Sequence, residues 1–251
     1  MSAPPPDRII SFEGAKNVRD LGGLETPSGT RVRRGMVYRG DGLSRLTAAD
    51  LTRLTQLGVR TIIDLRYDDE RARAPDRLPP GLMARCLQRG FFPQGSRELF
   101  TAVNEHGADA SAAYELMSSN YARMPFEHAR ELGAVLHDLL DPAGAPHFIH
   151  CTSGKDRTGV AIVLVLRAIG VDVETVIADY ALSNCEHQAV DVFGPDARAD
   201  AIAMVMSAHP GFLRAALEAI DREYGHIDDY FSLALDFGAA ERVALGRNLL
   251  V

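Results

Sequence analysis

The feature that most constrains this chain is a polar loop at residues 150–159 that joins two apolar segments. Residues 146–150 read as a short buried strand, because they follow turn signals at 141–144. Residues 160–169 are almost continuously apolar, longer than a typical buried strand and stopped by Gly170, which predicts a buried helix. The loop therefore leads into a helix N-terminus, where unpaired N–H groups and a partial positive charge favour an anion.

Cys151 begins this loop, and Arg157 follows it after five intervening residues. A free thiol has a pKa of about 8.5, but a helix N-terminus and neighbouring cations can lower this pKa to roughly 3.5–7.5, which produces a thiolate nucleophile. Lys155 and Arg157 supply such cations. The planar guanidinium of Arg157 can also hold two phosphate oxygens at once. The spacing therefore predicts a loop that binds a phosphate and attacks its phosphorus atom with Cys151.

The other loop residues fit the same anion site. Their backbone N–H groups can surround the remaining phosphate oxygens. Thr158 is expected to hydrogen-bond the cysteine sulfur, whereas His150 is expected to point to the opposite face of its strand and only to support the loop. The predicted phosphate-binding residues are Thr152, Ser153, Gly154, Lys155, Asp156 and Arg157.

Two other interpretations of the loop fail on spacing. A nucleotide-binding loop needs a glycine where Ile149 stands and a serine or threonine where Asp156 stands. A zinc site needs paired cysteine or histidine ligands, and no second cysteine lies near Cys151 in the sequence. Cys86 and Cys185 are expected to be small buried hydrophobes, and no metal or cofactor is expected.

The pattern His-Cys-x-x-Gly-Lys-x-Arg-Thr-Gly at 150–159 resembles the signature loop of the protein tyrosine phosphatase superfamily, whose members hydrolyse phosphate monoesters through a phosphocysteine. Its Lys-Asp-Arg version is similar to the atypical bacterial branch, which includes tyrosine/serine phosphatases and secreted enzymes active on phosphotyrosine and phosphoinositides. Further segments similar to that branch are 17–23, 38–39 with 46–47, 63–66 and 178–184. The resemblance covers roughly residues 9 to 250 and implies a metal-independent, cysteine-dependent phosphatase.

The leaving group of such a reaction needs a proton from a general acid. Many tyrosine phosphatases supply it from a Trp-Pro-Asp loop, but this chain has no tryptophan. Asp156 is the first candidate, because it lies inside the phosphate loop. Its alternative roles are to cap the helix or to neutralise Lys155.

Asp64 is the second candidate, because it closes the strand predicted at 59–64, and sites in α/β proteins assemble at the C-terminal ends of parallel strands. The resemblance implies that a matching aspartate handles the intermediate. The alternative for Asp64 is a salt bridge to Arg66 or Arg19. Weaker candidates are Asp76 and Asp196, each of which follows a proline.

The substrate expected from the resemblance is phosphotyrosine in proteins, with phosphoserine/threonine and phosphoinositides as competitors. Within the superfamily, a lysine at the position of Lys155 resembles enzymes that accept phosphoinositides, since a further cation favours multiply charged head groups. Its alternative role is to help hold one phosphate and the thiolate. Two alternatives come from other classes: a catalytically silent protein that binds phosphorylated ligands, and a rhodanese-like sulfurtransferase.

Composition limits the partners and the compartment. The chain has 251 residues, of which 46% are hydrophobic, enough for one substantial core. Its net charge of −7 and pI near 5.6 do not favour nucleic acid or an anionic membrane as a partner. Three widely spaced cysteines favour a reducing compartment over a disulfide framework. We therefore expect a cytoplasmic monomer with neither a signal peptide nor a membrane span, although leaderless export would leave no trace in the sequence.

Alternating strands and helices followed by a helical tail predict an α/β domain with a mostly parallel central sheet. Residues 1–7 are expected to be disordered, 8–251 to form a single phosphatase domain, and 93–121 to form either a lid over the pocket or ordinary peripheral helices. Strands are expected at 31–39, 59–64, 82–87 and 146–150. Helices are expected at 47–57, from Pro125 to 139, and at 160–169, 172–182, 197–207, 210–224, 228–235 and 239–250.

Overall fold

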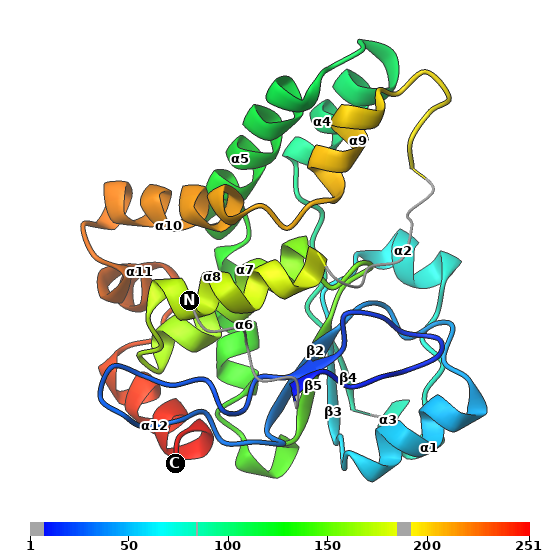
Figure 1. The fold of residues 1–251 in the computed structure, drawn as a ribbon. Coiled ribbons are helices and arrows are strands. Elements are labelled where there is room, and N and C mark those ends of the chain that lie inside the picture. The colour runs from blue at the N-terminus through cyan, green and yellow to red at the C-terminus, as the bar shows by residue number, and fades with distance from the viewer. Residues whose placement is uncertain (1–7, 84, 185–191) are drawn as a thin grey trace.

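The computed structural model describes residues 8–83, 85–184 and 192–251, and its centre is a five-stranded sheet (Figure 1). The strands are β1 (Arg19–Asp20), β2 (Val37–Gly40), β3 (Thr61–Asp64), β4 (Cys86–Gln88) and β5 (His147–His150), in the spatial order β1-β2-β5-β3-β4. Strands β2, β5, β3 and β4 are mutually parallel, and β1 is antiparallel to β2. The predicted α/β fold with a mostly parallel sheet is confirmed. The predictions for residues 1–7 and Cys185 lie outside the described residues.

Helices cover both faces of the sheet (Figure 1). Those in the described residues are α1 (Ala48–Gln56), α2 (Asp68–Arg73), α3 (Pro80–Met83), α4 (Gly95–Glu105), α5 (Ala110–Glu127), α6 (Ala129–Asp138), α7 (Asp156–Ala168), α8 (Val173–Ala181), α9 (Ala199–Met206), α10 (Pro210–Tyr224), α11 (Ile227–Ala234) and α12 (Ala239–Leu249). Helices α1 and α3 lie on one side of the sheet, and α6, α7, α8 and α12 lie on the other. The predicted helical tail is confirmed, with bounds shifted by one or two residues.

Strand β5 is buried on both faces, so its alternate side chains enter two separate cores. Phe148 belongs to one core together with Ile62 and Leu54, the latter from α1. Ile149 packs with Ile63 and the apolar residues of α7 on the other side. This two-sided burial fixes the register of β5, because a shift by one residue would exchange the two sets of side chains.

The same register brings the ends of three parallel strands to one edge of the sheet. Gly40 at the end of β2, His150 at the end of β5 and Asp64 at the end of β3 are lateral partners. The 151–155 loop leaves from this edge and enters α7 at Asp156, four residues before the predicted start. Asp156 and Arg157 therefore lie in the first helical turn.

Local capping signals in the sequence are confirmed at α1. The hydroxyl of Thr47 accepts from the Asp50 backbone N–H at 3.2 Å, and the Asp50 carboxylate accepts from the Thr47 N–H at 3.0 Å. Gly58 then ends the helix with a φ of +69°, a backbone conformation that favours glycine.

Two predicted strands are shorter than expected. Of residues 31–39, only those from Val37 onward join the sheet; Arg31 and Val32 form isolated bridges to Glu25 and Leu250 instead. The segment expected at 82–87 begins as the short helix α3 and reaches the sheet only at Cys86. Val32 and Leu82 are buried although neither lies in a sheet strand, so burial of an apolar side chain did not by itself indicate a strand.

The expectation that Pro125 begins a helix is wrong. Helix α5 runs through Pro125 to Glu127, and α6 begins at Ala129 after His128. Proline at a first helical position is common, but the same residue can lie in a last turn, where it removes one backbone hydrogen bond. Here Pro125 is buried, and its carbonyl accepts from the Tyr230 hydroxyl at 2.7 Å.

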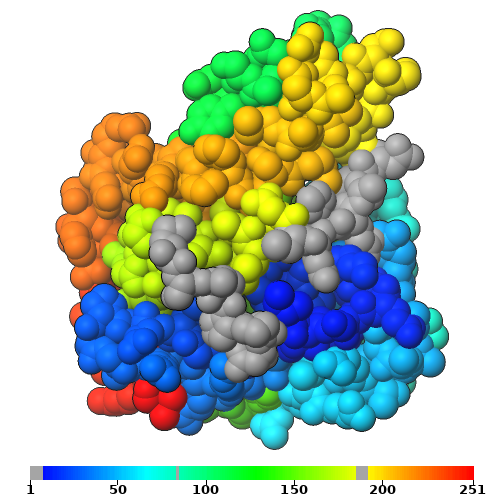
Figure 2. Space-filling view, in the orientation of Figure 1, coloured from blue at the N-terminus to red at the C-terminus, as the bar shows by residue number. Residues whose placement is uncertain are grey.

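Three helices overhang the sheet edge from which the loop leaves. Helices α4 and α5 are separated by Gly107, as expected, and α9 packs beside α5. They project above the body in Figure 1 and form one block in the space-filling view (Figure 2). We call α4, α5 and α9 the overhanging helices. Within the described ranges, no helix combines the length and the hydropathy that a membrane crossing requires.

Candidate active site

Cys151 directly follows β5, is 1% exposed, and packs with Ile149 and the apolar residues of α7. The loop packs tightly on the end of β2. Gly154 has a φ of +65°, and a Cβ there would lie 2.2 Å from the Gly40 carbonyl oxygen, so only glycine fits. The Gly42 N–H donates to the Thr152 carbonyl at 3.1 Å. These contacts fold the loop into a narrow turn at the start of α7.

Arg157 points its guanidinium toward the mouth of the loop. Its Nη1 and Nη2 donate to the two carboxylate oxygens of Glu70 in α2, at 2.5 and 2.7 Å. Nη1 also reaches the carbonyls of Leu65 at 3.1 Å and Phe91 at 3.3 Å. Burial alone would lower the pKa of Arg157, but Glu70 and the charge of Cys151 raise it above its usual range.

Glu70 occupies the position at which a bidentate anion would bind Arg157. Its carboxylate also accepts from the Thr152 hydroxyl at 2.5 Å and from the Tyr67 N–H at 3.1 Å. Burial alone would raise the pKa of Glu70, but the hydrogen bonds from Arg157 and Thr152 lower it. Sequence reasoning missed Glu70; the available signal was an acidic residue three positions after Tyr67, the N-cap of α2.

Asp156 lines a recess above the loop that Arg157 and Glu70 also line, and a side chain from an overhanging helix binds it. The Tyr121 hydroxyl of α5 donates to Asp156 Oδ1 at 2.6 Å and lies 2.7 Å from the Tyr180 hydroxyl of α8. Lys155 Nζ is 3.3 Å from Asp156 Oδ1, as one alternative for Asp156 required. The Asp156 side chain is nevertheless 32% exposed, so it can meet a ligand. Sequence reasoning missed Tyr121, which showed only helical spacing.

Lys155 does not present a free cation. Its ammonium donates to the carbonyls of Val205, in α9, and Ser207, the latter at 3.0 Å. The side chain lines the recess but is nearly buried, at 5% exposure. Lys155 therefore joins the loop to the end of α9.

The expected hydrogen bond from Thr158 to the cysteine sulfur is not formed. The Thr158 hydroxyl is fully buried in the first turn of α7 and has no hydrogen-bond partner among the described residues. The structure therefore does not bring the Thr158 hydroxyl into the predicted hydrogen bond with the cysteine sulfur.

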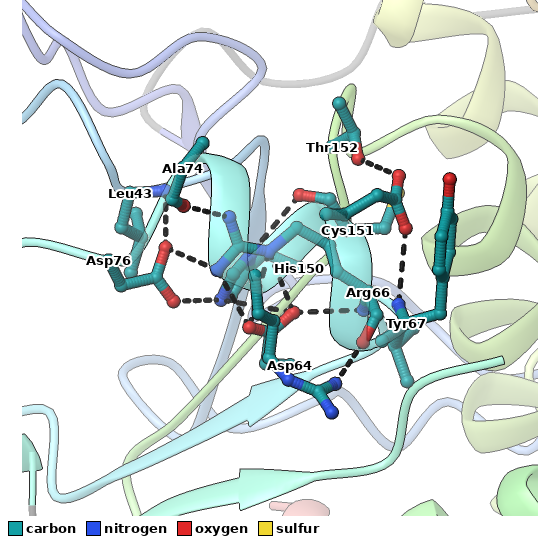
Figure 3. A network of polar contacts seen from close by, with 12 residues as sticks. Leu43, Asp64, Arg66, Tyr67, Ala74, Asp76, His150, Cys151 and Thr152 are labelled. Atoms are coloured by element: carbon teal, nitrogen blue, oxygen red, sulfur yellow. Dashed lines mark hydrogen bonds and ion pairs between the residues drawn. The ribbon is translucent and has the colours of Figure 1, made fainter.

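Asp64 belongs to a buried ionic network beside the loop (Figure 3). Its carboxylate accepts from Arg66 Nη2 at 2.7 Å and from the Arg66 backbone N–H at 2.9 Å. Arg66 Nη2 also lies 2.8 Å from Asp76 Oδ1. Asp64 is 1% exposed and does not reach the recess. The structure therefore places it in the salt bridge to Arg66 that was its alternative role.

His150 completes this network and points away from the recess, as predicted. Its Nε2 lies 3.1 Å from Asp76 Oδ2 and 3.9 Å from Asp64 Oδ1, and its Nδ1 lies 3.1 Å from the Cys151 carbonyl oxygen. Burial would lower the pKa of His150, but Asp64 and Asp76 raise it to about 9. The imidazole is therefore a cation at neutral pH and can donate to the Cys151 peptide.

One group of potential metal ligands occurs within the described ranges. Ligand atoms of Asp64, Asp76 and Cys86 lie within 4.8 Å of one another. Arg66 and His150 already neutralise both carboxylates. Burial raises the pKa of the Cys86 thiol to about 11, which opposes formation of a ligating thiolate. The donor set therefore fits an ionic network better than a metal ion.

The recess above the loop is a cavity of about 600 Å³ with two different surfaces. Its floor is polar and consists of Thr152, Ser153, Lys155, Asp156, Arg157 and Glu70. Its wall is apolar and comes largely from the overhanging helices and the segments beside them, with Phe92, Leu99, Phe100, Met117, Phe193 and Met206. The cavity can therefore accept a ligand with a charged end and an apolar body.

Comparison with known proteins assigns the chain to a family. The model of the tyrosine phosphatase family matches residues 10–251. A protein of Cupriavidus necator named Putative tyrosine-protein phosphatase is 28% identical over 239 residues, which are 92% of this chain and 86% of the relative. The triple specificity protein phosphatase PtpB of Mycobacterium tuberculosis is 28% identical over 261 residues, which cover 88% of this chain and 92% of the relative.

Among solved structures, the core catalytic domain of the PP-IP phosphatase SIW14 from S. cerevisiae covers 86% of this chain and 96% of its own, with 16% identity and a TM-score of 0.38. The family match spans nearly the whole chain and includes the loop from which phosphatase activity was predicted. This chain therefore belongs to the tyrosine phosphatase family and is an enzyme of the protein-tyrosine phosphatase type.

Proposed function

We propose that Cys151 is the nucleophile of a metal-independent phosphate monoester hydrolase and that phosphotyrosine in proteins is its principal substrate. The observation that carries this proposal is the arrangement of the loop: Cys151 begins it directly after β5, the N-terminus of α7 ends it, and Arg157 lies in the first turn of that helix. These three features provide a thiolate site and an anion site at one place.

The proposed reaction has two balanced steps. Cys151 Sγ attacks phosphorus and forms a sulfur–phosphorus bond, while the ester bond breaks and Asp156 gives its proton to the leaving oxygen. Water then attacks phosphorus, the sulfur–phosphorus bond breaks, and the Asp156 carboxylate takes the water proton. Arg157 and the loop N–H groups stabilise the equatorial oxygens in both steps. Substrate binding requires the phosphate to displace the Glu70 carboxylate from Arg157, or to share this guanidinium with it.

We assign the acid to Asp156 and not to Asp64. Asp156 faces the cavity and is oriented by the Tyr121 hydroxyl. Asp64 is enclosed and bound by Arg66, so it has no path to a leaving group. The role proposed for Asp64 is to hold Arg66 and, through His150, the start of the loop.

The apolar wall favours an aryl ester, because a phosphotyrosine ring can pack against Phe92, Phe100 and Met117 while its phosphate reaches the loop. Phosphoserine/threonine is the second candidate, since the relative from M. tuberculosis is named a triple specificity phosphatase. Phosphoinositides gain less from Lys155 than the sequence suggested, because its ammonium is already bound by carbonyls.

We further propose a domain organisation, a partner and a compartment for the enzyme. Residues 8–251 act as one phosphatase domain, in which α4 and α5, with α9, serve as a lid over the cavity. The partner is a phosphorylated protein, and the enzyme acts as a monomer. A reducing compartment such as the cytoplasm suits it, because a thiolate nucleophile is lost on oxidation.

The test compares the wild type with Cys151→Ser, Asp156→Asn and Asp64→Asn on aryl phosphates of graded leaving-group acidity and on phosphopeptides, with a chelator present. Cys151→Ser should have no measurable turnover. Asp156→Asn should lose about 10²–10⁴ in kcat on poor leaving groups and much less on good ones. Equal losses on both kinds of ester would refute the acid role of Asp156. Turnover by Cys151→Ser, or dependence of the wild type on metal, would refute the proposed function.

A further inference from the structure

Three sequence segments that the reaction does not use meet beneath the phosphate loop. Segment 17–23 contributes Asn17 and Arg19, segment 38–39 contributes Arg39, and segment 178–184 contributes Asp179. They come from β1, β2 and α8 and are joined by Arg8. Each of these five side chains is at most 4% exposed. We call Arg8, Arg19, Arg39 and Asp179 the arginine cluster.

The cluster and Asn17 hold the backbone of the loop. Arg39 Nη2 donates to the Gly154 carbonyl at 2.8 Å, and Asn17 Nδ2 donates to the same carbonyl at 3.1 Å and to the Ser153 carbonyl at 3.3 Å. In a planar trans peptide the carbonyl and the following N–H point in opposite directions. Holding these two carbonyls from beneath therefore directs the N–H groups of Gly154 and Lys155 toward the anion site.

Arg19 holds Asn17 directly and holds Arg39 through their shared partner Asp179. Its guanidinium donates to the Asn17 side-chain oxygen and to the Asn17 carbonyl at 3.2 Å, which leaves the Asn17 amide nitrogen facing the loop. It also donates to the Asp179 carbonyl at 2.8 Å and to Asp179 Oδ1 at 3.2 Å. Asn17 has a φ of +59°, a left-handed conformation that asparagine tolerates better than most residues.

The charges of the arginine cluster do not balance. Arg8, Arg19 and Arg39 all contact Asp179, the one carboxylate within the cluster, with Arg39 Nη1 at 3.0 Å from Asp179 Oδ2. Asp20 lies nearby, but its carboxylate accepts from the Gly22 and Gly35 N–H groups at 2.8 and 2.9 Å. Among the described residues, three guanidinium groups against one carboxylate leave an excess of two positive charges in a buried place.

Buried charge without compensation is costly, so this excess indicates a nearby anion. Arg39 is the lateral partner of Ile149, two residues before Cys151, and it donates to the Gly154 carbonyl in the loop that Cys151 begins. Burial and Arg19 lower the pKa of Arg39 to about 10, whereas Asp179 and the negative charge of Cys151 act to raise it. Electrostatic attraction is mutual: if the Cys151 thiolate favours the charged form of Arg39, the Arg39 cation equally favours the thiolate.

Other charged groups packed around Cys151 have counter-charges of their own. Arg157 on α7 is paired with Glu70 on α2, and His150 on β5 is paired with Asp76. Asp41, after β2, is a carboxyl whose pKa burial raises to about 7, so at neutral pH it is only partly charged. The arginine cluster is therefore the main uncompensated charge beside the cysteine among the described residues.

We propose that Asn17, Arg19 and Arg39 are positioning residues that orient the phosphate loop from beneath, and that the excess positive charge of the arginine cluster keeps Cys151 as a thiolate and favours a bound phosphate dianion. This inference rests on the proposed role of Cys151 as the nucleophile. It separates two effects, charge and geometry, that different substitutions can remove one at a time.

The experiment uses the full chain and measures iodoacetamide alkylation of the Cys151 peptide against pH by mass spectrometry, together with kcat and KM on an aryl phosphate. Arg39→Gln removes charge and hydrogen bond, Arg39→Lys keeps the charge, and Asn17→Gly keeps the charge and permits the positive φ. Arg89→Gln is the matched control, because Arg89 makes a bidentate pair with Asp138 at 2.7 and 2.8 Å away from the loop.

Arg39→Gln should raise the pH midpoint of Cys151 alkylation by about one unit and lower kcat/KM about a hundredfold. Arg39→Lys should move the midpoint less than half as far. Asn17→Gly should lower kcat about tenfold with the midpoint nearly unchanged, and Arg89→Gln should change neither. A folded Arg39→Gln with the wild-type midpoint, or a folded Arg39→Lys whose midpoint moves as far as that of Arg39→Gln, would overturn the charge effect. Wild-type kcat in Asn17→Gly would overturn the geometric one. Alkylation needs no turnover, so these failures are distinct from an active Cys151→Ser, which would refute the nucleophile itself.

Discussion

Two buried ionic networks flank the phosphate loop, and they differ in their charge balance. In the network of Figure 3, the cations Arg66 and His150 face the carboxylates Asp64 and Asp76. We call this the balanced network. In the arginine cluster, three cations share Asp179. Both networks are almost completely enclosed and both contact the loop, at the Cys151 and Gly154 carbonyls respectively.

The difference in charge balance indicates that one network mainly stabilises the fold and the other mainly supports the reaction. A balanced network satisfies its own charges, so its contribution is to the stability of the folded state. A network with excess charge is satisfied only when an anion is present, so its contribution depends on the thiolate and on the ligand. Removing a member of the balanced network should therefore lower stability, whereas removing a member of the arginine cluster should mainly weaken thiolate formation and ligand binding. The expected effects are taken from the largest to the smallest.

The largest effect is expected from Asp76→Asn in the balanced network. This change leaves His150 with only the more distant Asp64 carboxylate and one side of Arg66 without a counter-charge, which should lower the free energy of unfolding by about 3–5 kcal/mol. Urea denaturation of the whole chain measures it. Asp138→Asn, which breaks the partly exposed pair with Arg89, is the control and should cost about 1 kcal/mol or less. A cost for Asp76→Asn no larger than that of the control would contradict the stabilising role of the balanced network.

The second effect is a pH dependence of stability from His150. Its folded pKa of about 9 lies above its ordinary value of 6.5, because Asp64 and Asp76 outweigh burial and the opposing charge of Arg66. Its contribution is therefore complete below pH 6.5 and is lost as pH rises through 9, on the order of 3 kcal/mol. Asp41 also faces His150 and titrates near pH 7. Unfolding free energies measured between pH 6 and 9.5 should fall in the wild type and fall much less in His150→Gln; parallel curves would disprove the cause.

The third effect concerns phosphate binding to the loop that the arginine cluster supports from the opposite side. Inorganic phosphate at about a hundred times its Kd should stabilise the wild type by about 2.7 kcal/mol. If Arg39→Gln weakens phosphate binding about tenfold, it should lose about 1.4 kcal/mol of this stabilisation. Thermal unfolding with and without phosphate measures the difference. Arg89→Gln should keep the full shift, and equal shifts in both variants would remove the basis for a ligand role of the cluster.

The smallest effect is expected from Arg8→Gln. Arg8 contacts Asp179 and the Asp20 carbonyl, and within the described ranges it makes no hydrogen bond to the loop. Because two guanidinium groups still satisfy Asp179, the free energy of unfolding should change by less than about 1 kcal/mol, unlike the change in the balanced network. The alkylation midpoint of Cys151 should move by less than that of Arg39→Gln. A loss of stability as large as that of Asp76→Asn would show that the two networks behave alike.

Sequence reasoning succeeded where the determining interactions are local. The strand, loop and helix around Cys151, the Thr47 capping box and the stop at Gly58 all depend on residues within a few positions of one another. It failed at Pro125, where one local signal fits both the first and the last turn of a helix. The ends of the strand predicted at 31–39 failed for a related reason, since pairing partners and not propensity decide where a ladder stops.

The candidate site was only partly predictable, because many of its contacts join residues that are far apart in the sequence. Glu70 reaches Arg157 across 87 positions, and Arg39 reaches Asp179 across 140. No spacing rule joins residues so far apart. The choice between Asp156 and Asp64 also needed burial, because both follow strands at the same sheet edge and only one of them is exposed to the cavity.

The contacts of the overhanging helices with the loop have a consequence for motion. The Tyr121 hydroxyl on α5 binds Asp156, and carbonyls at the end of α9 bind the Lys155 ammonium. Any outward swing of α5 would strip a donor from the proposed acid, and any swing of α9 would release a cation 3.3 Å from it. A displacement of these helices would therefore also change the surroundings of the proposed acid, so a crosslink that immobilises them should alter kcat on poor leaving groups as well as the speed of substrate entry.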